Sequence, residues 1–242
     1  MNTLQRITKK TFEKFGILIR KYNPATSEDL RRIKLFEYYG IDLVFDIGAN
    51  KGQYATGIMD TGYTNKIVSF EPLSAAHGVI SKTSAKYPNW TVAPRCAIGA
   101  VNEQIEINIA ENLVSSTLLN MTDEHYNGAP ESKIIGKEKV QVLPLDEVGV
   151  NYIGTAKNIF IKIDVQGFEQ HVINGAQTML SKAKGVEIEI SLVPLYDNQT
   201  WLLPQILAYM SDKGFELTSI VPAFTNNETG KVLQCNGIFF RK

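Results

Sequence analysis

The chain has few cysteines, no long apolar run and no excess of charge of either sign. Its two cysteines, Cys96 and Cys235, lie far apart without Cys-x-x-Cys spacing, which excludes a disulfide framework and a zinc site built on cysteine pairs. No stretch approaches the roughly 20 apolar residues of a membrane span, and no apolar signal-peptide core opens the chain. Because 25 basic and 25 acidic residues cancel, no overall charge attracts nucleic acid. We therefore expect a cytoplasmic protein that does not bind nucleic acid.

What is present suits one α/β domain, because 242 residues, 44% of them hydrophobic, are enough to bury a sizeable core. Strand-like and helix-like segments alternate along residues 41–242, as a doubly wound sheet requires, and residues 1–40 form a basic helical arm in front of them. We expect strands at 43–47, 66–71, 90–94, 104–110, 139–145 and 186–191, a strand that ends at Asp164, and a terminal antiparallel hairpin from 214–221 and 232–241. The polar, poorly periodic segment 113–136 predicts a lid or loop over the site.

The most informative motif is typical of a strand, a glycine-rich turn and the start of a helix. It reads Val44-Phe45-Asp46-Ile47-Gly48-Ala49-Asn50-Lys51-Gly52. We expect Gly48 and Gly52 to let the backbone turn tightly and approach a ligand, with Asn50 between them in the binding loop. The following helix presents free N–H groups to this loop. Glu71 ends the next strand, where its carboxylate can accept hydrogen bonds from a ribose diol. Together these features predict an adenosine-containing cofactor.

The glycine spacing decides which cofactor is expected. Gly-x-x-x-Gly differs from the Gly-x-Gly-x-x-Gly fingerprint of dinucleotide-binding proteins, which disfavours a nicotinamide-dependent oxidoreductase. Asp46, just before the loop, places negative charge near the bound group, which repels phosphate and suits a ligand with an ammonium and a sulfonium. The predicted cofactor is S-adenosylmethionine.

A second motif ends a buried strand at Asp164 and enters a helix through Gly167. Since the carboxyl ends of central strands line the ligand crevice in open α/β sheets, Asp164 and Glu169 are expected to face it. The next strand carries Glu187 and Glu189 on one face, because strand side chains alternate. Two carboxylates on an otherwise apolar strand need a partner, such as a lysine, or a sheet edge.

The chain resembles the FkbM-type methyltransferases of the class I S-adenosylmethionine-dependent superfamily. The matching segments are 44–52, 70–72, 145–147, 161–169 with Gly175-Ala176, 187–189 and 234–239. The resemblance implies a Rossmann-like doubly wound sheet of seven strands, mostly parallel with a reversed terminal strand. It also implies methyl transfer to oxygen, commonly a hydroxyl of a sugar, glycan or natural product. Gln166 and Asn236 depart from the family pattern, which usually has Glu at the first position and commonly an acid at the second.

The resemblance also suggests where cofactor and acceptor lie. Ala97 falls where the superfamily usually holds adenine, although a plain buried turn explains it almost as well. Ser115 lies where the chain passes the amino acid end of the cofactor or the acceptor, and simple loop solvation is the alternative.

A hydroxyl is a weak nucleophile that needs a base or a metal to handle its proton. We take Asp164 as the leading base, with Glu169, Glu189 and His125 as alternatives and no metal-ligand set assigned. An ordinary surface histidine is the competing interpretation of His125. The alternative function from another class is a non-catalytic cofactor-binding or regulatory protein that retains the fold.

Residues 4–22 of the arm are basic and amphipathic. Arg6, Lys9, Lys10, Lys14, Arg20 and Lys21 alternate with Ile7, Phe12, Phe15, Ile17 and Leu18. Such a segment packs its apolar stripe on the domain, on a partner in an oligomer, or on an anionic membrane surface. The sequence leaves these three alternatives open.

Overall fold

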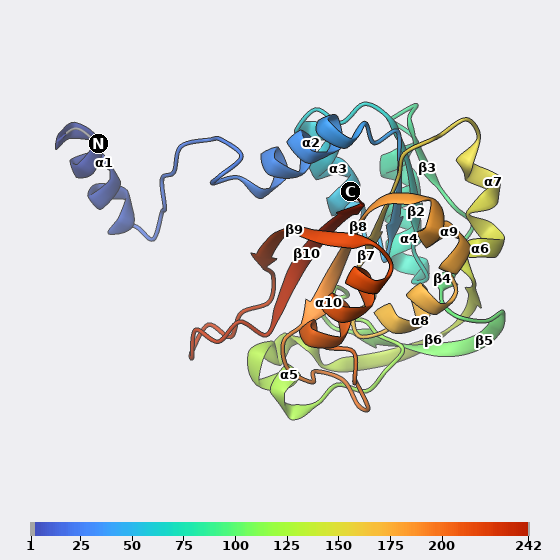
Figure 1. Cartoon of the computed structure of the whole chain (residues 1–242). Helices are drawn as coiled ribbons and strands as arrows, with labels where there is room; N and C mark the ends of the chain where they lie inside the picture. The colour runs from blue at the N-terminus through green and yellow to red at the C-terminus, as the bar shows by residue number, and fades with distance from the viewer. Residues whose placement is uncertain (1–2, 242) are drawn as a thin grey trace.

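The computed structural model describes residues 3–241 of the chain (Figure 1). Within them one sheet has the strand order β3 (Trp90–Val92), β2 (Lys66–Phe70), β1 (Leu43–Ile47), β7 (Ile159–Ile163), β8 (Ala183–Ser191), β10 (Gln234–Arg241), β9 (Phe215–Pro222). Neighbouring strands are parallel except at β10, which is antiparallel to both β8 and β9. The fold class expected above, a seven-stranded Rossmann-like sheet with a reversed terminal strand, is confirmed.

The core lies on both faces of this sheet because strand side chains alternate. On β1 the side chains of Leu43, Phe45 and Ile47 join one apolar cluster, and Val44 joins the other. The first cluster is covered by α6 (Leu145–Val148), α8 (Glu169–Asn174), α9 (Gln177–Lys182) and α10 (Leu203–Asp212). The second is covered by α2 (Glu28–Tyr39), α3 (Gln53–Asp60) and α4 (Ser74–Ser84). All five residues of β1 are buried, as two covered faces require.

A smaller sheet lies beside the carboxyl ends of the main strands. Its order is β4 (Ala97–Ile98), β6 (Ile134–Leu143), β5 (Glu103–Ala110). The segment between β5 and β6 contains the short helices α5 (Asp123–Gly128) and η1 (Pro130–Ser132). The helix α7 (Val150–Ile153) follows α6, and its Tyr152 and Ile153 pack against the first apolar cluster. The predicted pairing of the two middle strands is confirmed, but β6 begins at Ile134 instead of Lys139. Its first residues are largely exposed, so no burial pattern marked the start of this strand.

The predicted arm divides into two parts with different surroundings. The helix α1 (Thr3–Glu13) stands away from the domain at the end of an extended segment (Figure 1). The helix α2 instead packs on the sheet through the buried side chains of Ile33 and Phe36. Ser27 caps α2 by accepting a hydrogen bond from the Leu30 amide at 3.3 Å. No helix within residues 3–241 is both long and apolar enough to cross a membrane.

Candidate active site

The carboxyl ends of β1 and β7 meet at Gly48, which has a positive φ of 76°. A Cβ atom at this position would lie 1.8 Å from the carbonyl oxygen of Asp164. Only glycine allows the two strand ends to approach so closely. This contact places the loop after β1 and the acid that follows β7 beside one cavity.

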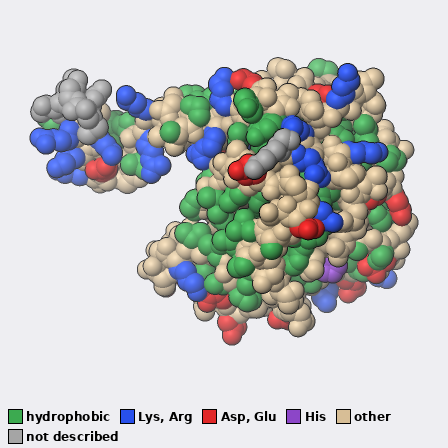
Figure 2. Space-filling view, viewed as in Figure 1, with side chains coloured by type: hydrophobic (Ala, Val, Ile, Leu, Met, Phe, Trp, Pro, Cys, Tyr) green, Lys and Arg blue, Asp and Glu red, His purple; other side chains and the backbone are tan. Residues whose placement is uncertain are grey.

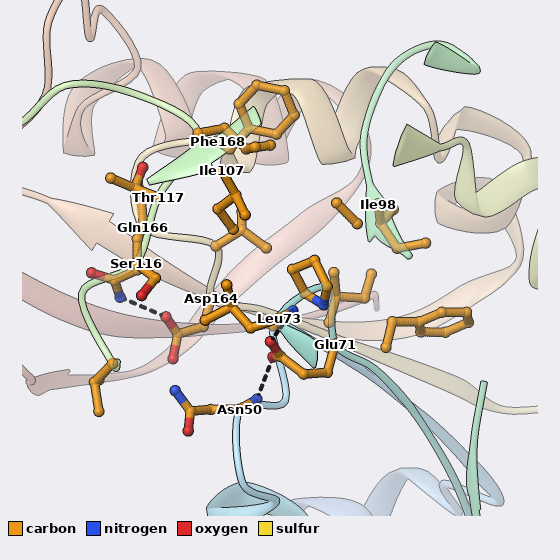
Figure 3. Close-up of a pocket in the computed structure, with 18 of the residues that line it drawn as sticks. Asn50, Glu71, Leu73, Ile98, Ile107, Ser116, Thr117, Asp164, Gln166 and Phe168 are labelled. Carbon is orange, nitrogen blue, oxygen red and sulfur yellow. Dashed lines mark hydrogen bonds between the residues drawn. The ribbon is translucent and has the colours of Figure 1, made fainter. Parts of the chain in front are cut away.

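The first cavity encloses about 660 Å³ of space, part of it open to solvent. Five of the predicted cofactor-site residues line it: Gly48, Asn50, Glu71, Ala97 and Asp164. Figure 3 shows polar side chains at one side of the cavity, with Asp164 and Gln166, and apolar Ile98 at the other. A cavity with one apolar and one polar end fits a ligand that has a flat base at one end and a charged group at the other.

Glu71 is fixed between these two ends at the end of β2 (Figure 3). Its Oε2 accepts a hydrogen bond from the Asn50 amide at 2.7 Å, and its Oε1 accepts one from the Leu73 amide at 2.8 Å. Burial raises the pKa of this carboxyl to about 7. Both oxygens keep a further lone pair for a ligand, so Glu71 fits the predicted role of ribose acceptor.

Two residues predicted to contact the cofactor have another role. Asp46 is completely buried and is not among the residues that line the cavity, so its carboxylate does not contact a ligand bound there directly. Its Oδ2 accepts a hydrogen bond from the Ser69 hydroxyl at 3.0 Å, and its Oδ1 lies 3.3 Å from Nζ of Lys162. Burial raises the pKa of Asp46. Gly52 has a φ of 90°, and a Cβ there would lie 2.5 Å from the ring of Trp90, so this glycine serves packing and not ligand approach.

Lys162 of β7 is a site residue that the sequence analysis did not identify. Its Nζ lies 3.3 Å from Asp46, 3.4 Å from Oδ2 of Asp164, and donates a hydrogen bond to the Gly48 carbonyl at 3.2 Å. Burial alone would lower the pKa of Lys162, but the adjacent carboxylates raise it overall. The sequence feature that could have indicated this role is a charged lysine within an otherwise apolar five-residue strand, which is fully buried in the structure.

A second cavity of about 900 Å³ adjoins the first. Its polar lining comprises Glu28, Asp29, Arg32, Asn50, Gln53, Tyr54, Lys162, Asp164, Glu187, Glu189 and Asn236. Among the described residues, Asp164 is the only acid that lines both cavities. Its side chain is about one-third exposed, at 35%. Asp164 therefore stands where a group bound in one cavity meets a group bound in the other.

Gln166 connects Asp164 to Glu189, the predicted alternative base. The Gln166 Nε2 donates to Oδ1 of Asp164 at 2.8 Å and to Oε2 of Glu189 at 2.7 Å. Its Oε1 accepts a hydrogen bond from the Tyr196 hydroxyl at 2.8 Å. Burial, followed by the neighbouring carboxylates of Asp164 and Glu169, raises the pKa of Glu189 well above its ordinary value. The side-chain amide nitrogen and oxygen of Gln166 are therefore both hydrogen-bonded, and its backbone is left-handed, with a φ of 54°.

Glu169 was expected to face the crevice, and the structure corrects this. It is buried at the start of α8 and does not line any of the three cavities described here. Its Oε1 accepts hydrogen bonds from the amides of Val165 at 3.3 Å and Gly167 at 3.0 Å. Burial raises its pKa to about 7. Glu169 therefore stabilises the turn that positions Asp164. The spacing of residues in the sequence did not predict these hydrogen bonds to the backbone.

His125 and Ser115 line a third cavity, of about 810 Å³, and not the first two. His125 is 1% exposed, so the interpretation as a surface histidine is wrong. The rings of Tyr196 and Phe224 surround it, and its two nitrogens have no hydrogen-bond partner among the described residues. Burial lowers its pKa to about 4, so it is neutral at pH 7. The Ser115 hydroxyl accepts a hydrogen bond from Asn112, whereas the next residues, Ser116 and Thr117, line the first cavity.

Glu187, the other acid of β8, is paired with an arginine. Arg32 of α2 donates to its two carboxylate oxygens at 2.8 and 2.7 Å, and the Tyr54 hydroxyl donates at 3.0 Å. The sequence predicted that this carboxylate needs a partner, but not that the partner comes from the arm. Among residues 3–241 no group of three His, Cys, Asp or Glu side chains is arranged to hold a metal ion.

The strand order is that of a Rossmann-like sheet with a reversed terminal strand, and the Glu71 carboxylate stands at the end of β2. The family model of the methyltransferase FkbM domain matches residues 46–217, and the chain therefore belongs to this family. Membership confirms the resemblance described above and S-adenosylmethionine as the cofactor. A search of curated proteins finds no match.

Several solved structures are similar to this chain. TehB from Haemophilus influenzae is 12% identical with a TM-score of 0.47, and the match covers 88% of this chain and 62% of that one, less than two thirds of its length. Fibrillarin from Aeropyrum pernix, with natively bound S-adenosyl-L-methionine, is 8% identical, with a TM-score of 0.45 and coverage of 83% and 66%. The 1,6-didemethyltoxoflavin-N1-methyltransferase from Burkholderia thailandensis is 10% identical, with a TM-score of 0.45 and coverage of 87% and 76%.

Proposed function

We propose that this protein methylates a hydroxyl group on a sugar, a glycan or another polyhydroxylated natural product. The observation that carries the proposal is the position of Asp164, the acid that lines both the first and the second cavity. In this arrangement the first cavity holds the cofactor and the second holds the acceptor. The bound cofactor supplies an activated methyl group, and Asp164 lies at the junction where the acceptor oxygen must arrive.

The lining of the second cavity supports a neutral, hydroxyl-rich acceptor. Carboxylate and amide groups dominate it, and these groups accept and donate the hydrogen bonds that a sugar offers. Its only described cations, Arg32 and Lys162, are already engaged by carboxylates at 2.7 to 3.4 Å. A phosphate or carboxylate on the acceptor would find no free cation there, and the surrounding acids would repel it.

In the proposed reaction, four residues of the two cavities have separate roles. Asp164 accepts the proton of the acceptor hydroxyl as the oxygen becomes nucleophilic. Gln166 fixes one oxygen of this carboxylate, and Lys162 lies beside the other, which limits its rotation. Glu71 anchors the ribose, so the remaining contribution is alignment of the two groups in a site that excludes water.

The proposal is tested by measuring S-adenosylhomocysteine formation from S-adenosylmethionine with methyl glycosides of hexoses and deoxyhexoses as acceptors. We expect acceptor-dependent turnover that falls by roughly 10²- to 10⁴-fold in Asp164→Asn, because a general base contributes about this much. Asp212→Asn, at the exposed end of α10, is the matched control and keeps wild-type turnover.

Two outcomes contradict the proposal. Methylation of amine acceptors with no methylation of hydroxyls would assign a different chemistry to the same cavities. Tight S-adenosylhomocysteine binding without transfer to any acceptor would favour the alternative, a non-catalytic cofactor-binding or regulatory protein.

A further inference from the structure

The N-terminal arm, defined here as residues 3–22, exposes an unusual amount of apolar surface. Seven of its apolar side chains are between 39% and 76% exposed: Ile7, Phe12, Phe15, Ile17, Leu18, Ile19 and Tyr22. Phe15 and Tyr22 are the most exposed of these, at 76% and 73%. Figure 1 shows that α1 stands away from the domain, so the domain does not cover this surface. Contiguous apolar surface of this kind marks a binding region.

The same arm is strongly basic in a chain that is neutral overall. It contains six basic residues and one acidic residue, Glu13, whose carboxylate lies 3.9 Å from Nζ of Lys9. Figure 2 shows Lys and Arg side chains gathered on the projecting arm. The arm therefore carries a local positive charge that the rest of the molecule balances.

The two kinds of side chain occupy different sides of α1. At 3.6 residues per turn, Ile7 and Phe12 flank one side of the helix, whereas Arg6, Lys9 and Lys10 project from the opposite side. The apolar residues Phe15, Ile17, Leu18 and Ile19 continue beyond the end of the helix. This separation is typical of helices that lie in the plane of a membrane interface.

We propose that the arm docks on an anionic membrane surface. The apolar side chains enter the boundary between headgroups and acyl chains, and the basic side chains pair with anionic headgroups. A second copy of the chain fits less well as the occupant, because two arms of this charge repel each other. The two signals, apolar insertion and positive charge, reinforce each other on one short segment.

Docking brings the second cavity near the membrane. The arm leads through the turn Asn23–Ser27 into α2, and α2 supplies Glu28, Asp29 and Arg32 to the wall of that cavity. Because Arg32 is bonded to Glu187 of the sheet, α2 cannot separate from the domain while the arm is bound. The arm is thus connected to the cavity by a short and firmly attached element.

The test is co-sedimentation of the full chain with vesicles of phosphatidylcholine alone and with vesicles of equal parts phosphatidylcholine and phosphatidylglycerol. We expect binding only to the anionic vesicles, weakened by salt. The double variant Lys9→Glu, Lys10→Glu lowers the partition coefficient by at least tenfold, because each basic residue near such a surface contributes roughly a fivefold factor. The double variant Phe15→Ser, Leu18→Ser lowers it by a similar factor through lost insertion.

Matched control variants lie outside the arm. Ile135→Ser and Lys137→Glu change equally exposed positions on β6 and are expected to bind as the wild type does. Far-UV circular dichroism of each variant shows that the domain is still folded. Wild-type protein that stays in the supernatant with anionic vesicles overturns the proposal. A second result would also overturn it: the wild-type protein is a dimer in gel filtration, the double variant Phe15→Ser, Leu18→Ser is a monomer, and neither binds vesicles. The arm would then contact a second copy of the chain.

Discussion

Arg32 of α2 and Glu187 of β8 form a two-point ion pair in the wall of the second cavity, with N–O distances of 2.8 and 2.7 Å. Their side chains are only 5% and 4% exposed. The pair joins the N-terminal part of the chain to the centre of the sheet. It therefore makes α2 part of the domain, although the sequence of α2 is continuous with the basic arm.

Replacing one partner of this pair is expected to be costly. Arg32→Ala leaves the buried Glu187 carboxylate without its arginine, and we expect unfolding to require about 3 to 5 kcal/mol less free energy. Urea denaturation measures this difference. The double variant Arg32→Met, Glu187→Leu serves as the comparison and is expected to be less destabilised, because it leaves no fully buried charge unpaired. Glu28 and Asp29, which also pair with Arg32, are partly exposed. Equal stability of the single and double variants would contradict this account.

Cofactor binding is expected to depend on Glu71. Glu71→Ala removes a buried acceptor held by the amides of Asn50 and Leu73, so S-adenosylhomocysteine binding is expected to weaken by about 1.5 to 3 kcal/mol, roughly 10- to 150-fold. Isothermal titration calorimetry gives the dissociation constants. Asp212→Asn is the control, and unchanged affinity in Glu71→Ala would remove this residue from the binding site.

The raised pKa of Glu71, about 7, predicts opposite pH effects on stability and on binding. A folded-state pKa above the ordinary 4.5 adds stability that is complete below about pH 4.5 and is lost as the pH rises through about 7. The carboxylate is the better ribose acceptor, so affinity for S-adenosylhomocysteine is expected to increase over the same rise. Calorimetry from pH 6 to pH 8 tests this, and Glu71→Gln should show a flat profile. A wild-type profile as flat as that of the variant would contradict the assignment.

Gly52 is expected to affect stability and not cofactor affinity. An alanine Cβ would lie 2.5 Å from the Trp90 ring, and the backbone has a positive φ, so Gly52→Ala is expected to lose about 1 to 3 kcal/mol of stability. Thermal unfolding and calorimetry separate the two effects. Gly48→Ala is the contrasting variant, because its Cβ would meet the backbone of Asp164 at the first cavity and should weaken both properties. Equal loss of S-adenosylhomocysteine affinity in both variants would show that Gly52 contributes to cofactor binding, as the sequence predicted.

His125 predicts loss of stability in mild acid. Its pKa falls from an ordinary 6.5 to about 4 in the folded protein, so between these values the unfolded chain binds a proton that the folded chain does not. Stability therefore decreases as the pH falls from about 6.5 to 4, by on the order of 2 to 3 kcal/mol. The difference in unfolding free energy between wild type and His125→Phe isolates this contribution. A difference that does not change with pH would show that the pKa of His125 is the same in the folded and the unfolded chain.

The sequence predicted those parts of the fold that short-range patterns determine. The terminal hairpin was found near its expected position, although β9 is largely exposed. The buried runs of β1 and β7 were also found near their expected positions, because burial on both faces requires continuous apolar segments. Asp164 was placed correctly at the cavity for the same reason, since it directly follows a central strand. Glu71 was found by the same rule at the end of β2.

The rest of the site depends on contacts between distant residues, which no local pattern contains. Asp46 precedes the binding loop, but only the position of Lys162 on the neighbouring strand shows that the acid holds a lysine and not a ligand. Arg32 lies 155 residues before its partner Glu187. The Glu169 carboxylate accepts hydrogen bonds from the amides of its own turn and therefore does not face the cavity. Sequence spacing does not distinguish an acid that caps a turn from one that faces a substrate.

The two cavities are built from largely separate parts of the chain. The first is formed by the ends of β1 and β2 with the β4 region, whereas α2, β8 and β10 form the far wall of the second. Substitutions in α2 or at Asn236 therefore change the shape of the second cavity while Glu71 and its amide partners stay in place. If the first cavity binds the methyl donor and the second the acceptor, as proposed above, acceptor preference can change through substitutions in the second cavity without altering the residues that bind the donor.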